Sequence, residues 1–269
     1  MKKVVLLVVA VCLGVFSFAQ DQNASELVTK ANDAVTAKDY VKAVELFEKV
    51  LAIPDHGQDV ETINKVLGQL KPVVAKDEAN SALGSKEYKK AVELYHAAAK
   101  DYPDAGIAEL AGKSFYNEGI VSYKGSDFLT AAMCFRIAEK EFNFEAEKSE
   151  KYKKASLKKV AESLAAEGKA SVDEISVCED NKALLIEELA NAYVKDGNEL
   201  YKAGVEIINA ANTKVNDGSM STADETYTAE VAKAKKEFAA ALEVLKKAAT
   251  IDASNVNAQK LIEACKAAM

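Results

Sequence analysis

The sequence predicts an all-α protein built from stacked helical hairpins. The 269 residues include only 12 glycines and 3 prolines, too few turn residues for a β-sandwich or β-barrel. A stripe of alternating large and small apolar residues also recurs four times along the chain. Because 49% of the residues are hydrophobic and the 29% that are charged are interleaved with them, we expect a packed core rather than a disordered chain.

The first 19 residues are interpreted as a secretory signal peptide. Lys2 and Lys3 precede an apolar run from Val4 to Phe18, and Ala19 supplies a small residue for cleavage. This run is shorter than the roughly 20 residues that span a bilayer. We therefore expect cleavage near Ala19 and an exported, periplasmic or secreted product without membrane insertion. A retained N-terminal membrane anchor is the alternative.

Each copy of the stripe predicts the second helix of a hairpin. Steps of three, four and three residues lie along one helix face, so a neighbouring helix can approach the small residues while the large ones fill the adjacent gaps. The four copies are Tyr40-x2-Ala43-x3-Phe47-x2-Val50, Tyr88-x2-Ala91-x3-Tyr95-x2-Ala98, Phe128-x2-Ala131-x3-Phe135-x2-Ala138 and Phe238-x2-Ala241-x3-Leu245-x2-Ala248.

The preceding helix of each hairpin is predicted by a small residue 12 positions before the first alanine of the stripe. These residues are Ala31, Ala79, Gly119 and Ala229. Turns are predicted at Lys38-Asp39, Lys86-Glu87 and Ser126-Asp127, directly before the first three stripes. Pro54 and Pro103 follow the first two stripes, where a helix must end.

This pattern resembles the tetratricopeptide repeat, a helix–turn–helix unit of about 34 residues. The resemblance implies a right-handed superhelix, an α-solenoid, over residues 20–269. The first alanines of the stripes are 48, 40 and 110 residues apart, so the repeats are degenerate and extended rather than uniform. The expected parts are units near 25–55, 72–104, 112–144 and 222–255, a degenerate region over 147–212 and a capping helix over 256–268.

The long gaps between stripes are expected to contain helices of their own, for a total of nine to twelve. Residues 56–71 either lengthen the first helix of the second unit or add a helix before it. Residues 147–169 and 182–212 predict two long helices. Because Leu200-Tyr201-x2-Gly204-Val205 echoes Phe115-Tyr116-x2-Gly119-Ile120, the second of these long helices is expected to pair with the helix of Phe238.

No motif predicts an enzyme, a metal site or a cofactor. Gly106-x5-Gly112-Lys113-Ser114 has one residue too many between its glycines for a phosphate-binding loop. His56 and His96 are the only histidines and have no ligand-spaced partners. The net charge of −7 and the single arginine, Arg136, argue against nucleic-acid binding.

The resemblance implies a protein-binding scaffold or adaptor that uses the inner face of the superhelix. Tyr116, Ile120, Tyr123 and Lys124 share one helix face there, and Tyr201 continues it. Tyrosines beside apolar residues are typical interface anchors, although the inserted helices could equally cover them. A carrier that holds a small molecule or peptide within the helical coil is the alternative function.

A carboxylate-binding clamp is a further hypothesis. Lys76 and Asn80 are four residues apart on one helix face, and Asn117 lies in the equivalent helix of the next unit. The resemblance implies that such residues hold the C-terminal carboxylate of a partner, with charge from the lysine and donors from the amides. The match is partial, because Arg136 lies on a second helix and cannot complete the clamp.

Overall fold

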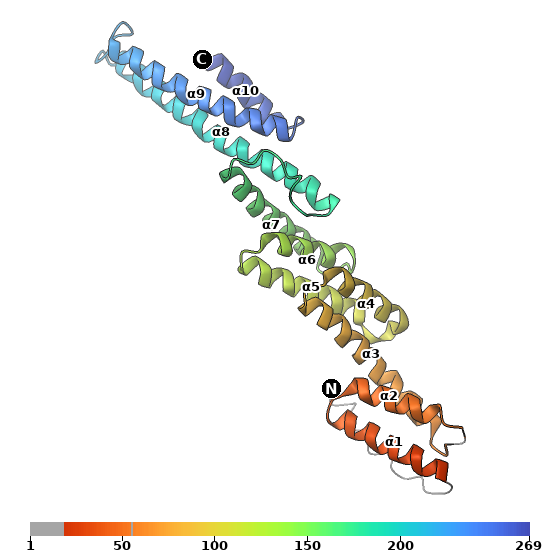
Figure 1. Ribbon diagram of the computed structural model, residues 1–269. Coiled ribbons are helices and arrows are strands. Elements are labelled where there is room, and N and C mark those ends of the chain that lie inside the picture. The colour runs from red at the N-terminus through yellow and green to blue at the C-terminus, as the bar shows by residue number, and fades with distance from the viewer. Residues whose placement is uncertain (1–18, 55) are drawn as a thin grey trace. The chain divides into compact units, whose positions relative to one another are not determined.

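The computed structural model describes residues 19–269 except residue 55, with side chains from residue 23 onward. This part of the chain forms ten α-helices and no strand, so the predicted all-α fold and helix number are confirmed (Figure 1). The predicted signal peptide covers residues 1–19. Of these, residues 1–18 lie outside the described residues.

The described helices belong to two compact units, one ending at Phe115 and the other beginning at Tyr116, so the division falls within α5. In each unit a helix packs mainly on its neighbour in sequence, as a solenoid-like fold requires. The helices are α1 (Ala19–Thr36), α2 (Tyr40–Leu51), α3 (Val60–Gly84), α4 (Tyr88–Asp101), α5 (Ile107–Lys124), α6 (Phe128–Lys140), α7 (Ala146–Ala166), α8 (Glu179–Asn216), α9 (Glu225–Ile251) and α10 (Val256–Ala268).

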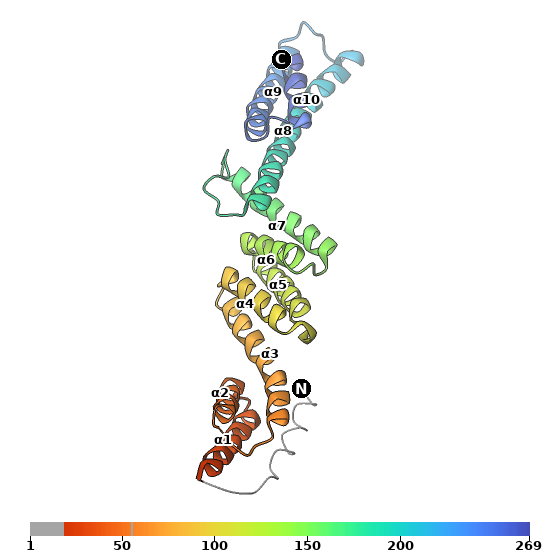
Figure 2. The same cartoon turned by 90° about the vertical axis from the view of Figure 1, so that its right-hand side faces the viewer.

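The first unit contains the α1/α2 hairpin, the long helix α3 and helix α4. The first part of α3 packs on α2, and α4 packs on α3 (Figure 2). The stripe residues of α2 share one core cluster with Ala31 of α1 and Ile63 of α3. Helix α3 continues through Pro72 as a single helix of 25 residues. Residues 60–71 therefore lengthen the first helix of the second predicted unit and do not form a separate helix.

All four stripes lie on helices and face the core, as predicted. Their second to fourth residues are buried on α2, α4, α6 and α9, and the leading aromatic is partly or fully buried. The small residues opposite them permit close approach of the partner helix. A Cβ added to Gly119 of α5 would lie 2.9 Å from the ring of Phe135 on α6.

The same contact recurs between α8 and α9, which form the longest hairpin of the second unit. A Cβ added to Gly204 would lie 2.6 Å from the ring of Phe238. The similarity of the sequence around Gly204 to that around Gly119 therefore predicts the pairing of α8 with α9 correctly. The prediction for Ala229 is wrong. Helix α9 is continuous from Glu225 to Ile251, so Ala229 lies exposed on the same helix as Phe238 and not on its partner.

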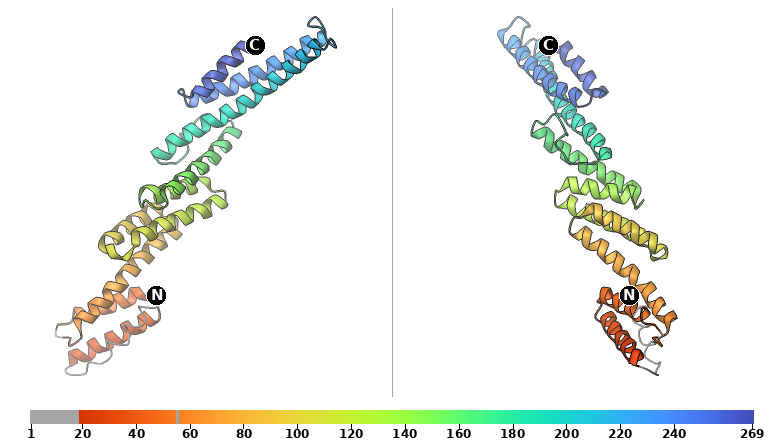
Figure 3. Two further views of the ribbon diagram at one scale, coloured as in Figure 1. Left: turned by 180° about the vertical axis from the view of Figure 1, so that it is seen from behind. Right: turned by 45° about the vertical axis from the view of Figure 1, so that its right-hand side comes forward.

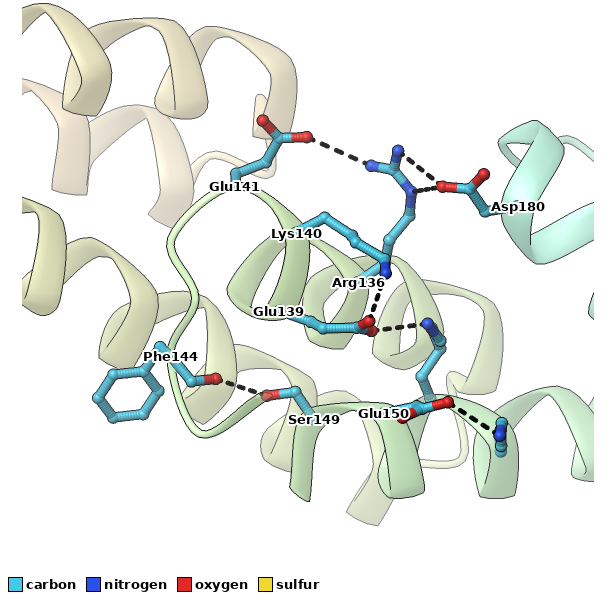
Figure 4. A network of polar contacts seen from close by, with 10 residues as sticks. Arg136, Glu139, Lys140, Glu141, Phe144, Ser149, Glu150 and Asp180 are labelled. Atoms are coloured by element: carbon cyan, nitrogen blue, oxygen red, sulfur yellow. Dashed lines mark hydrogen bonds and ion pairs between the residues drawn. The ribbon is translucent and has the colours of Figure 1, made fainter. Parts of the chain in front are cut away.

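A polar network joins α6 to α7 and α8 (Figure 4). Glu139 of α6 accepts from Lys153 of α7 at 2.6 Å and from Lys140 at 2.8 Å. The side chains of Glu139 and Lys153 are only 10% and 9% exposed, so this is a largely desolvated ion pair. Arg136 reaches Asp180, at the start of α8, over 3.1 Å.

The turns that end α1, α3 and α5 share one backbone geometry. Lys38, Lys86 and Ser126 have φ values of 62°, 62° and 64°, in the left-handed region. Each turn carries a pair of backbone hydrogen bonds that reach back over the helix end, as in a Schellman motif. The same turn ends α7, where Gly168 occupies the left-handed position with φ 76°.

Replacing Ser126 by glycine is expected to stabilise the protein. The left-handed conformation costs an L-residue about 1 kcal/mol, part of which returns as added freedom of the unfolded chain, so we expect a net gain of about 0.5 kcal/mol in the free energy of unfolding. Urea denaturation followed by circular dichroism measures this gain. Gly168→Ala is the matched control and should destabilise by about 1 kcal/mol; a loss of stability in Ser126→Gly would contradict the assignment of strain.

Candidate functional site

The residues of the predicted clamp are not brought together in one unit. Lys76 and Asn80 lie on α3 in the first unit, whereas Asn117 lies exposed on α5 in the second. The side-chain carbonyl of Asn80 accepts a hydrogen bond from the hydroxyl of Tyr95 on α4, and the Lys76 ammonium lies 3.6 Å from Asp77. Lys76 and Asn80 thus already have partners within their own unit.

Tyr116 and Tyr123, two residues of the predicted inner face, contact aromatic rings of α6 and α7. Tyr116 packs edge-to-face on Phe135 of α6 and on Tyr152 of α7, with ring centroids 5.5 Å and 6.2 Å apart. Tyr123 also contacts Tyr152, at 6.3 Å. Burial is the largest cause that raises the pKa of the Tyr116 hydroxyl. Helix α7 therefore covers part of both tyrosines, which are half-buried.

The remaining inner-wall residues differ in exposure. Tyr201 packs against Phe238 of α9 with ring centroids 5.4 Å apart, Ile120 is half-buried and Lys124 is exposed. The contact of Tyr201 belongs to the packing of the α8/α9 hairpin. The role of the five residues in binding a partner stays a prediction.

An open groove between α8 and α10 was not predicted from the sequence. It consists of two hollows of about 550 Å³ and 600 Å³ that share Asn191 and Asn257. We call it the α8–α10 groove. Its lining residues on α8 are Ala183, Ile186, Glu187, Asn191, Val194, Lys195 and Asn198. Those from the turn after α9 and from α10 are Asp252, Ser254, Asn255, Val256, Asn257, Lys260 and Leu261.

The turn between α9 and α10 fixes one wall of this groove. The Asp252 carboxylate accepts from the backbone N–H of Ser254 at 2.9 Å and from its hydroxyl at 2.6 Å. Asn255 caps α10 by accepting from the N–H of Ala258, and its amide donates to the side-chain carbonyl of Asn191 on α8 at 3.1 Å. The start of α10 is thereby tied to α8.

Apolar packing holds the rest of α10 in place. Ala258 packs in the core cluster with residues of α7, α8 and α9, and Cys265 packs against Ala241 and Leu245 of α9. Burial raises the pKa of the Cys265 thiol. Figure 3 shows α10 alongside α9 from two further sides. Residue numbers along the groove increase in the same direction on α8 and α10, so the two helices run parallel.

The side chains that line the groove are suited to binding a ligand through hydrogen bonds, charge and apolar contact. Four of its lining residues are asparagines, whose amides both donate and accept hydrogen bonds. Lys195 and Lys260 take part in none of the ion pairs that the described residues form. Half-buried Ile186, Val194 and Leu261 supply apolar contact area. Histidine and cysteine are absent from these lining residues, so the groove presents neither of these groups as a base or thiol nucleophile.

The sequence contains a pattern that indicates one wall of this groove, the wall on α8. Asn191, Lys195 and Asn198 follow one another at steps of four and three residues, the spacing of one helix face. Leu185 and Leu189 belong to an apolar stripe on the opposite side of the same helix. This stripe predicts which side of the helix packs in the core, but it does not predict a binding role for the polar side. The other wall, on α10, lies more than 50 residues further along the chain.

Within residues 19–269, no helix is both long and apolar enough to cross a membrane. Nor do the described residues include a cluster of three or more histidine, cysteine or acidic side chains that could hold a metal ion. No protein-family model, curated protein or solved structure matches the chain.

Proposed function

We propose that this protein is an exported, non-enzymatic scaffold or adaptor of the tetratricopeptide-repeat type, which binds a protein or peptide partner. The repeat assignment is supported by the four stripes, the recurrent turns at Lys38, Lys86 and Ser126, and the two glycine–phenylalanine contacts. Export is supported by the charged and apolar composition of residues 2–19. Repeat folds of this kind offer extended surfaces between successive helices.

The α8–α10 groove is the observation on which the proposal depends. It lies between two parallel helices, the first and third of three consecutive ones. Amides, two lysines without ion-pair partners and half-buried apolar side chains line it together. This combination of apolar contact area with hydrogen-bonding groups is typical of surfaces that bind a polypeptide.

A carrier of small molecules is the second candidate function. Such a carrier needs a pocket that encloses most of its ligand. The two hollows of the groove have volumes within the usual range, about 550 Å³ and 600 Å³, but they are open along the surface. An open groove fits a chain segment better than an enclosed small ligand.

Site-specific photo-crosslinking tests the proposed function. A benzophenone amino acid placed at Asn257, which is exposed within the groove, should crosslink to a discrete partner in cells of the source organism. The matched control places it at Ala240, which is also exposed, lies on α9 and does not line the groove. We expect the Lys195→Glu/Lys260→Glu double variant to reduce the Asn257 crosslink by about fivefold, because charge complementarity guides association.

Equal labelling from Asn257 and Ala240 would count against the groove as a binding surface. A crosslink confined to Asn257 that survives the charge reversal would keep the groove but remove the role of the two lysines. The folding of each variant is checked by circular dichroism, because both charged positions are on helices.

A further inference from the structure

The charges of the α8–α10 groove are separated along its length. Glu187 of α8 and Asp252 of the opposite wall line the first hollow, and Lys195 and Lys260 line the second. On each wall the lysine follows the acidic residue by eight positions. The two walls therefore present the same order of charge, acidic first and basic second.

Hydrogen-bonding side chains lie between and beside these charges. Asn191 and Asn257 are shared by both hollows, Asn255 lies at the acidic end and Asn198 at the basic end. Asn191 and Asn255 bond to each other, whereas Asn198 and Asn257 make no side-chain hydrogen bond within the described part of the chain. Their amides are available to donors and acceptors of a ligand.

The amides favour an extended ligand over a helical one. A helix satisfies its own backbone N–H and C=O groups, so a row of amides would add little to its binding. An extended chain leaves these groups unpaired and gains hydrogen bonds from amide side chains that can both donate and accept. Half-buried Val194 and Leu261 sit beside the amides and can contact alternate side chains of such a segment.

The separation of charge sets a length for the ligand. Eight residues of α-helix rise about 12 Å between Glu187 and Lys195. An extended chain advances about 3.3 Å per residue, so it covers the same distance in about four residues. A basic and an acidic side chain four positions apart would thus each lie opposite a group of the other sign.

We infer that the α8–α10 groove binds an extended peptide segment that carries a basic and an acidic residue separated by three others, an inference that rests on the proposed function. The basic residue faces Glu187 and Asp252, and the acidic residue faces Lys195 and Lys260. Partners without this pair of charges are disfavoured, because one end of the groove would then keep its charges without a partner.

The probe for this inference is the blocked peptide acetyl-Thr-Lys-Val-Pro-Val-Glu-Thr-amide, whose proline keeps the chain extended. Titration into the 15N-labelled exported protein should shift the side-chain amide signals of Asn191, Asn198 and Asn257. A peptide with glutamine in place of both charged residues should bind about tenfold more weakly, and so should one with lysine and glutamate adjacent.

Charge reversal in the protein makes the test specific. Lys195→Glu/Lys260→Glu should weaken the lysine–glutamate peptide about tenfold and favour a peptide with lysine at both charged positions. The matched control is Lys235→Glu/Lys236→Glu on α9, which changes net charge equally at exposed positions outside the groove. This control should leave both affinities within about twofold of the parent protein.

Equal binding of the charged and glutamine peptides would overturn the inference while leaving the groove as a binding surface. Failure of every peptide to shift the three asparagine signals, with the Asn257 crosslink still formed, would overturn the extended bipolar ligand but not the scaffold function. Loss of both the peptide shifts and the crosslink would overturn the inference and the proposed function together.

Discussion

Gly204→Leu is expected to lower the free energy of unfolding by about 3 kcal/mol, the upper end of the usual cost of overpacking. A Cβ at this position would lie 2.6 Å from Cε1 and 2.9 Å from Cδ1 of Phe238, closer than side-chain carbons approach in folded proteins. The ring cannot move away easily, since Phe238 is only 3% exposed and packs against Tyr201. The α8/α9 hairpin must therefore open.

Urea denaturation, followed by circular dichroism, measures this loss. Gly119→Leu should behave similarly, because its added Cβ would lie 2.9 Å from Phe135. Gly68→Ala is the control: it lies exposed within α3, where an added Cβ meets nothing within 4 Å. That substitution should stabilise the helix by up to about 1 kcal/mol, as alanine does over glycine in a helix interior. If Gly204→Ala raised the free energy of unfolding as much as Gly68→Ala, this result would contradict the close contact between Gly204 and Phe238.

The helices were predictable where local geometry decides the structure. The spacing of three, four and three residues specifies a helix face regardless of what packs on it, and α2, α4 and α6 begin at the aromatic residue of their stripe. Residues 256–268 likewise form α10 as predicted. The glycine motif in α8 indicated that this helix pairs with α9. Where two helices approach closely, a glycine of one lies opposite a large side chain of the other, because the interior is close-packed.

The error at Ala229 has a physical cause. A fixed offset of 12 residues between facing small residues holds only when a short turn joins the two helices, as after Lys38 and Ser126. In the fourth hairpin the turn spans residues 217–224 and both helices extend well beyond the contact. The residue that faces Phe238 is then Gly204, 34 positions earlier in the chain.

The sequence left undecided, or did not predict, the features that depend on segments far apart in the chain. The exposure of Tyr116 and Tyr123 depends on whether α7 reaches them, and their contacts with Tyr152 show that it does. The α8–α10 groove exists because α10 returns to α8 after the whole of α9. Taken singly, Asn257 and Lys260 have the pattern of a solvated helix face, and only the tertiary contact places them opposite Asn191.

Glu139→Gln is expected to lower the free energy of unfolding by about 3 kcal/mol, because removing one partner of a buried pair leaves the other charge uncompensated. The remaining charge is the ammonium of Lys153, whose side chain is 9% exposed and whose contact with Glu139 is 2.6 Å. Lys153→Met should cost less, about 1 kcal/mol, since Glu139 keeps its contact with Lys140 at 2.8 Å. The double variant should recover much of the loss, because no buried ammonium remains.

The pH dependence separates this electrostatic cause from simple packing. Burial raises the pKa of the Glu139 carboxyl, but hydrogen bonds from Lys140 and Lys153 outweigh burial and hold its pKa below the ordinary value of 4.5. Since the folded pKa is the lower one, the pair stabilises the protein fully above that ordinary value and loses its effect as the pH falls through the folded pKa. The difference in unfolding free energy between the parent protein and Glu139→Gln should therefore be largest near pH 7 and shrink toward about pH 3. Urea denaturation at both pH values measures it, and a difference that stayed constant would assign the cost to packing instead of charge.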